Sequence, residues 1–124
     1  MRNKYFKGCT GNKSYTFIRA DNHSRVLLFE GMMDFLSFLT LDNQSELVYP
    51  TLILNSTTLL NNELILKLSR FEVHAYLDND SAGNRTMKLL KAGLVKVKDH
   101  RSEYLGHKDL NEYLVARKKH WKKN

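Results

Sequence analysis

The sequence predicts an α/β fold, with a four-stranded parallel sheet of strand order 2-1-3-4, helices on both faces and a short N-terminal hairpin or edge strand. Two observations carry this prediction. Apolar runs of strand length alternate with segments of helical periodicity, which is typical of parallel sheets joined by right-handed crossovers. Carboxylates follow the first and third runs, at Glu30 and at Asp78 and Asp80. These acids can meet if strands one and three are neighbours, because ligands of open α/β sheets bind beyond the carboxyl ends of the strands, at the switch in strand order.

The lead-in, residues 1–25, is expected to form the hairpin or edge strand. Polar and apolar residues alternate over Ser14–Ile18, and Gly8 and Gly11 favour turns. The aromatic residues of the lead-in lie among lysines and could stack on bases. Packing of an edge strand against the domain is the more common reason for such a pattern, and we favour it here.

The first predicted strand is Val26–Phe29, whose continuous apolar run indicates burial on both faces. Glu30 ends the strand, and a glycine turn leads into a helix over Met32–Thr40, since apolar residues recur there at helical spacing. Met32 and Met33 are expected to pack in the core.

The remaining elements follow by the same criteria. They are strands at Thr51–Asn55, Glu72–Leu77 and Val95–Lys98, and helices over residues 59–68 (with Ser56, Thr57 or Thr58 as N-cap), over residues 84–92 (with Gly93 just after its end) and from Lys108 onward. We therefore expect one central domain at residues 26–116, preceded by the lead-in and followed by a basic tail at residues 117–124.

The composition fits a soluble globular protein, with 42% hydrophobic and 27% charged residues among 124. No apolar run approaches the roughly 20 residues of a membrane span, and the N-terminus lacks the apolar segment of a secretory signal. The single cysteine, Cys9, excludes an internal disulfide and a thiolate zinc site built from this chain alone. We therefore expect a cytoplasmic protein without a membrane partner.

The positive charge is concentrated at the C-terminus. Five basic residues in the last eight positions account for most of the net charge of +7, which falls to +2 without them. Such a patch favours nucleic acid or another polyanion. A solvated terminal helix, basic because helix C-termini favour cations, explains the charge equally well.

The acids at the predicted strand ends supply hard oxygen ligands of the kind that Mg²⁺ and Mn²⁺ prefer. Residues i and i+2 of an ending strand point the same way, so Asp78 and Asp80 can face one metal, or one of two metals each. Without a metal, repulsion should raise the pKa of at least one acid, and Lys108 offsets that repulsion only in part. An Asp-x-Asp pair alone is a weak signal, because Asp also caps helices and builds turns.

A divalent ion held by few carboxylates usually acts on phosphate groups, which complete its coordination shell together with water. Glu30 is then either a ligand or a general acid/base, and the sequence leaves this open. The backbone amides of Ser81–Gly83, at the start of a predicted helix, offer an anion site.

Three segments carry a resemblance to a known family. Glu30–Ser37 resembles the Toprim pattern E-G-x-x-D, and Asp78–Gly83 resembles its second part, D-x-D-x-A-G. The Ala-Gly after the acids is most similar to primases of the DnaG type. Gly106–Leu114 resembles a third primase element, G-K-D-P-D-E-Y-L. Arg2–Gly8 resembles the lead-in of primase-like proteins of mobile elements that carry an N-terminal zinc finger.

The resemblance implies a Toprim fold, a Rossmann-like arrangement of three layers, and a set of site residues. The implied metal-binding acids are Glu30, Asp34, Asp78, Asp80 and Asp109, of which Glu30, Asp78 and Asp80 would be catalytic. The implied contacts to phosphate or nucleic acid are Gly31, Ser81, Gly83, Arg85 and Lys108. Two departures from the family pattern are Leu110 for the usual Pro and Asn111 for a common Asp, and the lost carboxylate is expected to weaken one metal position.

By the same resemblance, the expected function is Mg²⁺- or Mn²⁺-dependent nucleotidyl transfer in primer synthesis, with little activity from this domain alone. The expected partners are a single-stranded DNA template, nucleoside triphosphates, an upstream zinc-finger domain and a replicative helicase. The alternatives are strand cleavage, as in Toprim nucleases and topoisomerases, and a noncatalytic DNA-binding module that uses the basic tail. A phosphoacceptor receiver domain is disfavoured, because receivers carry paired acids after strand one and a lone Asp after strand three.

Overall fold

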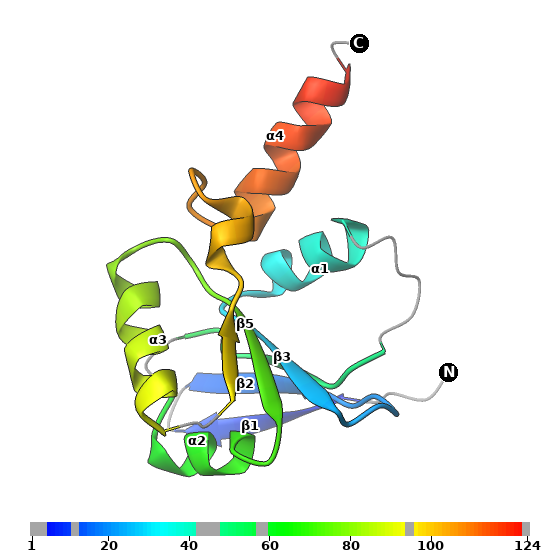
Figure 1. Cartoon of the computed structure of the whole chain (residues 1–124). Helices are drawn as coiled ribbons and strands as arrows, with labels where there is room; N and C mark the ends of the chain where they lie inside the picture. Colours follow the sequence, from blue (N-terminus) through cyan, green and yellow to red (C-terminus); the bar gives the residue numbers. More distant parts are fainter. Residues whose placement is uncertain (1–4, 11–12, 42–47, 57–59, 94–95, 123–124) are drawn as a thin grey trace.

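The computed structural model describes residues 5–10, 13–41, 48–56, 60–93 and 96–122 (Figure 1). In chain order the elements are β1 (Tyr5–Thr10), β2 (Lys13–Ile18), β3 (Arg25–Phe29), α1 (Met32–Leu41), β4 (Thr51–Ile53), α2 (Asn62–Leu68), β5 (Glu72–Tyr76), α3 (Ser81–Gly93), β6 (Val97–Asp99), a 3-10 helix (Arg101–Tyr104) and α4 (Leu110–Lys122).

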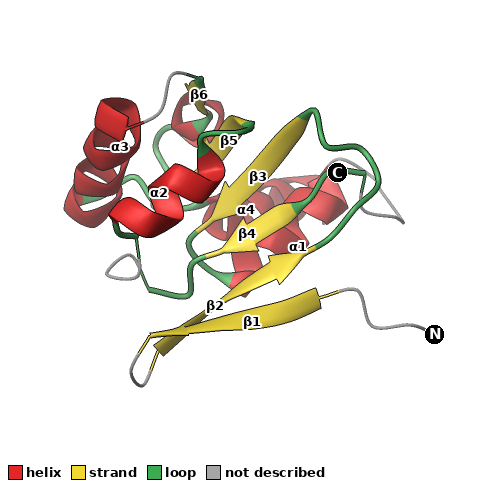
Figure 2. Ribbon diagram, turned by 90° about the horizontal axis from the view of Figure 1, so that it is seen from below, coloured by secondary structure: helices red, strands yellow, loops and turns green. Residues whose placement is uncertain are grey.

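The strands form one mixed, six-stranded sheet in the order β1-β2-β4-β3-β5-β6 (Figure 2). The four strands β4, β3, β5 and β6 are parallel, and they stand in the order predicted for the parallel strands. The expectation of a four-stranded sheet was nevertheless incomplete. The N-terminal hairpin of β1 and β2 joins the same sheet, because β2 pairs antiparallel with β4. This pairing satisfies backbone groups of β4 that would otherwise form an open edge.

Helices cover both faces of the sheet (Figure 2). On one face α2 and α3 pack over a core that includes Val26, Leu28 and Leu90, and on the other face α1 and α4 pack over Leu27 and Phe29. Successive residues of β3 thus face opposite cores, which explains its continuous apolar run. Among the described residues, none of the helices has the length and apolarity that a membrane crossing requires.

The element boundaries differ from the predicted ones at several ends. α3 begins at Ser81, directly after the acids, and it includes Gly93 as its last residue. α4 begins at Leu110, and β6 runs from Val97 to Asp99. Val95, where the predicted strand begins, lies outside the described residues.

Two predictions about local structure were wrong. The N-cap of α2 is Asn61, whose side-chain oxygen accepts from the Leu64 amide at 2.9 Å, and not Ser56; Thr57 and Thr58 lie outside the described residues. Met32 and Met33 are 42% and 60% exposed, because α1 turns other residues, among them Phe35 and Ser37, toward the sheet.

Gly83 allows α3 to start in contact with the end of β5. A Cβ atom at this position would lie 2.0 Å from the backbone oxygen of Asp78, a distance that no side chain tolerates. The connection from β5 to α3 therefore requires glycine at this position, and this connection sets the positions of Asp78 and Asp80.

We predict that Gly83→Ala lowers the free energy of unfolding by about 1–3 kcal/mol or more, because the backbone has to move to admit the methyl group. Urea unfolding followed by circular dichroism measures the change. Gly31→Ala is the matched control, since its Cβ would meet Asp34 Oδ2 at an ordinary 3.8 Å. Equal losses in the two variants would contradict this explanation.

Candidate metal centre

The acids of the first and third predicted strands meet, as expected, at the carboxyl ends of β3 and β5. The parallel register pairs Phe29 with Tyr76, so Glu30 and Asp78 leave the sheet side by side. The Asp78 amide donates a hydrogen bond to Glu30 Oε2 at 2.6 Å. This contact joins the two loops directly and fixes the Glu30 side chain toward the Asp78–Asp80 turn.

Five carboxylates form two overlapping groups at this point. Glu30, Asp78 and Asp80 each place an oxygen within 4.8 Å of the others, and so do Asp34, Asp78 and Asp109. Opposite ligands of one Mg²⁺ lie about 4.2 Å apart, given metal–oxygen distances of about 2.0–2.1 Å. Each group therefore has nearly the dimensions of a coordination shell, and Asp78 is common to both.

Four of the five carboxylates are fixed by a backbone amide. Glu30 accepts from the Asp78 amide, as described above. Asp80 Oδ1 accepts from the Gly83 amide and Asp109 Oδ1 accepts from the Glu112 amide, each at 2.8 Å, so Asp80 and Asp109 cap the N-termini of α3 and α4. Asp34 Oδ1 accepts from the Asn111 amide at 3.2 Å. A carboxylate has two oxygens, so such a bond orients the group and still leaves an oxygen for an ion.

Asp78 is the exception, and its environment is costly for a negative charge. Asp78 Oδ1 is buried and has no hydrogen-bond partner among the residues that the structure describes. Burial, followed by the charges of Glu30 and Asp34, raises the pKa of Asp78 to about 7. A buried acceptor without a donor is destabilising, and a divalent cation between the two groups would remove both costs.

The neighbouring acids show the same effect in smaller measure. Burial raises the pKa of Asp34 to about 6 and also raises the pKa of Glu30, although backbone hydrogen bonds oppose both shifts. Lys108 is exposed beside the cluster and lowers the pKa of both acids slightly. The pKa of at least one acid is raised, as expected, but burial contributes more to the shift than repulsion between the acids does. The chemistry of the site fits a hard divalent ion.

The sequence did not single out Asn79, which holds the third segment of the site in place. Its side-chain amide donates to the carbonyl oxygens of Arg101, Tyr104 and His107, at 3.4, 3.3 and 3.0 Å. Its backbone amide donates to the Lys108 oxygen at 2.6 Å. These partners lie more than twenty positions away, so no local pattern could reveal them. Asn79 thereby positions Asp109 next to Asp78.

Asn111, which stands where a second Asp is common in primases, connects α4 to α1. Its backbone amide binds Asp34, and its side-chain oxygen accepts from the Ser37 hydroxyl at 3.0 Å. Ser37 is buried, and its single hydroxyl proton is shared with the Met33 carbonyl oxygen, which lies 2.8 Å from Oγ. The amide side chain thus makes a structural contact at this position.

The residues expected to contact phosphate differ in how accessible they are to a ligand. Ser81 is exposed at the start of α3, Arg85 is exposed further along it, and Lys108 is exposed beside the acids. The Gly83 amide is already bonded to Asp80, so it is engaged within the protein as the cap of α3. The Gly31 oxygen accepts from the Phe35 amide at 3.3 Å in the first turn of α1.

Comparison with known proteins adds two findings. The Toprim-like family matches residues 27–114. The fold is similar to a crystal structure of the primase fragment of the bacteriophage T7 primase-helicase protein, with a TM-score of 0.58 and 15% identity over 98% of this chain and 66% of that fragment. No curated protein matches the chain significantly.

A second similar structure holds primase domains of T7 with the lagging-strand DNA polymerase, bound to an RNA/DNA hybrid and dTTP. Its TM-score is 0.58, with 13% identity over 98% of this chain and 81% of that one. At such identities the likeness is one of fold.

We predict that the acids destabilise the metal-free protein as the pH rises. The folded state binds protons on Asp34 and Asp78 up to about pH 6 and 7, whereas the unfolded chain releases them near 3.8. Between those values the folded state holds more protons, so the free energy of unfolding falls as the pH rises toward neutrality.

Asp78→Asn keeps the shape of the side chain and removes its charge. In EDTA at pH 7.5 the variant should be about 1–2 kcal/mol more stable than the parent protein. This gain is smaller than the free energy that the full pKa shift corresponds to, because solvent screens the charges of these half-buried acids. Urea unfolding at pH 5 and 7.5 measures this, with the exposed Asp21→Asn as control. A less stable Asp78→Asn at pH 7.5 would argue against the electrostatic interpretation.

Proposed function

Because this chain belongs to the Toprim-like family, we propose that it is the metal-dependent catalytic domain of a primase-like protein, and that its acidic cluster holds Mg²⁺ or Mn²⁺ for nucleotidyl transfer. The observation that carries the proposal is the position of Asp78. Its buried, unpaired oxygen lies where two groups of carboxylates overlap. A purely structural cluster would have no reason to leave that oxygen without a donor.

The arrangement suits a pair of ions that share Asp78 as a ligand, with Glu30 and Asp80 on one side and Asp34 and Asp109 on the other. Bound there, divalent ions would supply positive charge to neutralise a phosphoryl group and would orient the attacking oxygen. The protein itself supplies rigid ligands, since backbone amides fix four of the carboxylates. Exposed Lys108 is available to the phosphates of an incoming nucleotide.

Glu30 is proposed as a ligand and not as a general base. Its Oε2 is bonded to the Asp78 amide, which favours the charged form and keeps the side chain directed into the cluster. The role is distinguishable by substitution, because Glu30→Gln retains the geometry and one neutral oxygen ligand but cannot accept a proton.

Primer synthesis is the preferred reaction because the similar structures are primase fragments, one of them bound to an RNA/DNA hybrid and dTTP. This chain spans 66% of the first fragment, so full synthesis is proposed to need more protein than this chain. The proposed partners are a single-stranded DNA template, nucleoside triphosphates, an upstream zinc-finger domain and a replicative helicase.

Metal binding is the direct test. Isothermal titration calorimetry should show Mn²⁺ binding to the parent, and Asp78→Asn should weaken it at least about tenfold, because one substitution removes a ligand from both groups. Asp80→Asn removes a ligand from one group and should have the smaller effect, while Asp21→Asn should have none. A parent chain that binds no divalent ion would overturn the proposal.

Product analysis separates the reaction classes. With Mn²⁺, nucleoside triphosphates and single-stranded DNA, primer synthesis gives short labelled products on a gel, which Asp78→Asn abolishes. Nicking of supercoiled plasmid without such products would favour strand cleavage instead. DNA binding that is indifferent to EDTA, without either reaction, would favour a noncatalytic module.

A further inference from the structure

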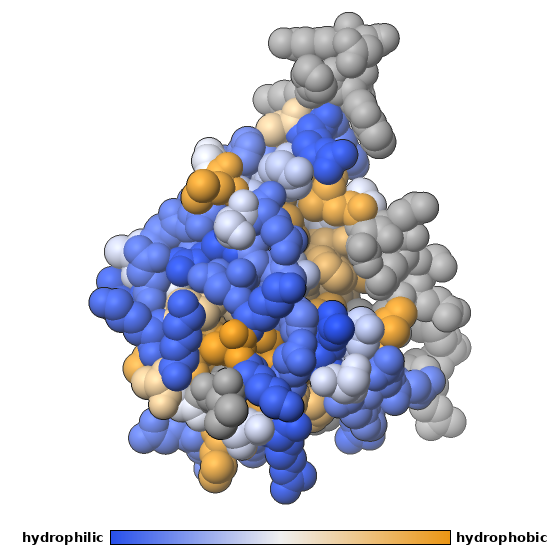
Figure 3. Space-filling model, in the orientation of Figure 1, coloured by the Kyte–Doolittle hydropathy of each residue, from blue (hydrophilic) through white to orange (hydrophobic). Residues whose placement is uncertain are grey.

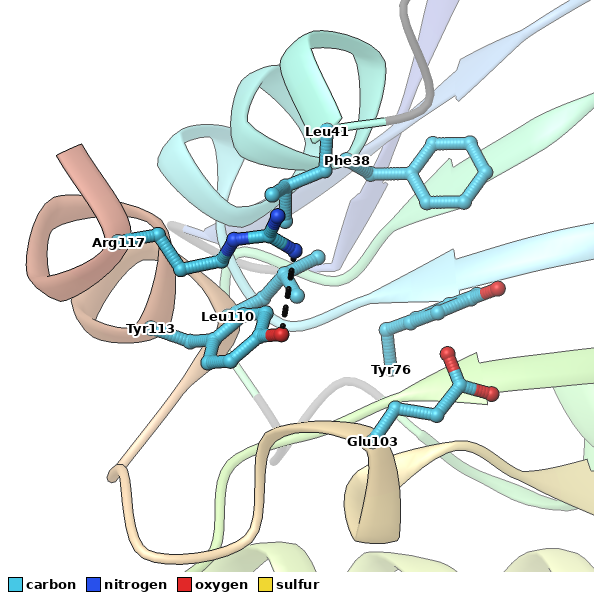
Figure 4. A pocket seen from close by; sticks show the side chains of 7 residues that line it. All are labelled: Phe38, Leu41, Tyr76, Glu103, Leu110, Tyr113 and Arg117. Atoms are coloured by element: carbon cyan, nitrogen blue, oxygen red, sulfur yellow. Dashed lines mark hydrogen bonds between the residues drawn. The ribbon is translucent and has the colours of Figure 1, made fainter. Parts of the chain in front are cut away.

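A cavity of about 240 Å³ opens on the α1 and α4 face of the sheet, and none of the metal-centre acids lines it (Figure 4). Its lining residues are Phe38, Leu41, Tyr76, Glu103, Leu110, Tyr113 and Arg117. An apolar cavity of about 150 Å³ holds a benzene molecule, so this cavity has room for a heteroaromatic ring with additional atoms attached. In Figure 3, apolar residues also reach the surface between α1 and α4, whereas the surface over α3 is mostly hydrophilic.

The walls of the cavity come from one face of each element. Leu110, Tyr113 and Arg117 follow one another at i, i+3 and i+7 along α4, which places them on a common helix face. Tyr76 is held firmly at the sheet, since its ring stacks on Phe29 at 5.1 Å and on His100 at 4.3 Å between centroids. The cavity is therefore shaped by the fold and does not depend on a loose side chain.

Its two charged residues lie on different elements and carry opposite signs. The Arg117 guanidinium lies 5.7 Å from the centroid of the Tyr113 ring and donates to its hydroxyl at 3.3 Å. Glu103 accepts from His100 Nδ1 through one carboxylate oxygen. A guanidinium has five N–H donors and a carboxylate has two oxygens, so both groups retain capacity for a ligand. The Glu103 side chain is 58% exposed and so accessible from solvent.

We infer that this cavity receives an unpaired base of single-stranded nucleic acid, with the ring against the aromatic walls, a base N–H donated to Glu103 and a flanking phosphate on Arg117. The inference rests on the nucleic-acid role proposed above but not on the metal centre. Aromatic side chains combined with a cationic track are the usual means of holding single strands.

Charge and position favour a nucleic acid over a peptide or a second copy of the chain. The chain carries a net charge of +7, and Arg117 begins the basic run of its last positions. α4 leads this run away from the sheet (Figure 1). Asp109, which directly precedes α4, and Arg117 are eight residues apart, or about 12 Å along the helix axis. A single strand with a phosphate at the metal centre would thus reach the cavity within a few nucleotides.

The test compares a short fluorescent oligodeoxyadenylate with an abasic sugar-phosphate strand of the same length, by anisotropy in EDTA at fixed salt. Arg117→Ala should weaken binding of the deoxyadenylate about tenfold, and the matched control Lys118→Ala, which removes the same charge from the next position, about twofold. On the abasic strand no base enters the cavity to hold the flanking phosphate at Arg117, so both variants should lose only about twofold. Circular dichroism verifies that each variant is folded.

Two further variants separate stacking from charge. Tyr113→Phe keeps the ring and should bind the deoxyadenylate within about twofold of the parent, whereas Tyr113→Leu should lose about fivefold. Equal affinity of the parent for the two strands, or equal losses in Arg117→Ala and Lys118→Ala, would overturn the inference. Self-association that these variants abolish, without any base-dependent binding, would identify a protein interface and would also overturn it. Because EDTA is present throughout, failure here leaves the Mn²⁺ titration as a separate test of the metal centre.

Discussion

The parallel pairing of β3 with β5 is the constraint on which the candidate site depends. The register of Phe29 with Tyr76 brings Glu30 to the Asp78 amide, and a hydrogen bond of 2.6 Å closes the gap between two segments that are 48 positions apart. Because α1 and α3 start immediately beyond these strands, the same pairing also sets where their N-termini lie. A slip of the register by one residue would turn every side chain of the strand to the other face and separate the acids.

Helix N-termini make the crowded acids tolerable. Asp80 and Asp109 directly precede α3 and α4, and Asp34 lies in the first turn of α1. The positive end of each helix dipole therefore faces the cluster, and backbone amides of the first turns of α3 and α4 donate hydrogen bonds to the carboxylates. This arrangement offsets part of the repulsion but not that at Asp78, whose pKa remains the most strongly raised among these acids. Asp78 is therefore the position at which the proposed divalent ion would relieve the most unfavourable charge.

A second set of polar contacts links the start of β5 to the cavity. The buried His74 bonds to Glu72 through Nε2 at 2.6 Å and to His100 Nε2 through Nδ1 at 2.8 Å, and His100 bonds in turn to Glu103. Burial lowers the pKa of the His74 imidazole, which favours the neutral form of this ring. The chain of contacts fixes the 3-10 helix against β5 and sets the position of Glu103 at the cavity. Its members lie in β5, in the 3-10 helix and at the residue that precedes that helix, and their spacing along the chain gives no periodic signal.

The sequence by itself determined the α/β class, the order of the parallel strands, and the convergence of Glu30, Asp78 and Asp80, because hydrophobic periodicity and the geometry of parallel sheets are local or topological properties. It also indicated Asp34 and Asp109 through their motifs. Only the tertiary structure decided that the hairpin extends the same sheet and that Asn79 ties the Asp109 loop to the end of β5. It also decided that Asp78 Oδ1 is buried without a hydrogen-bond partner among the described residues. These features are contacts between residues far apart in the chain, and such contacts exist only once the elements have packed.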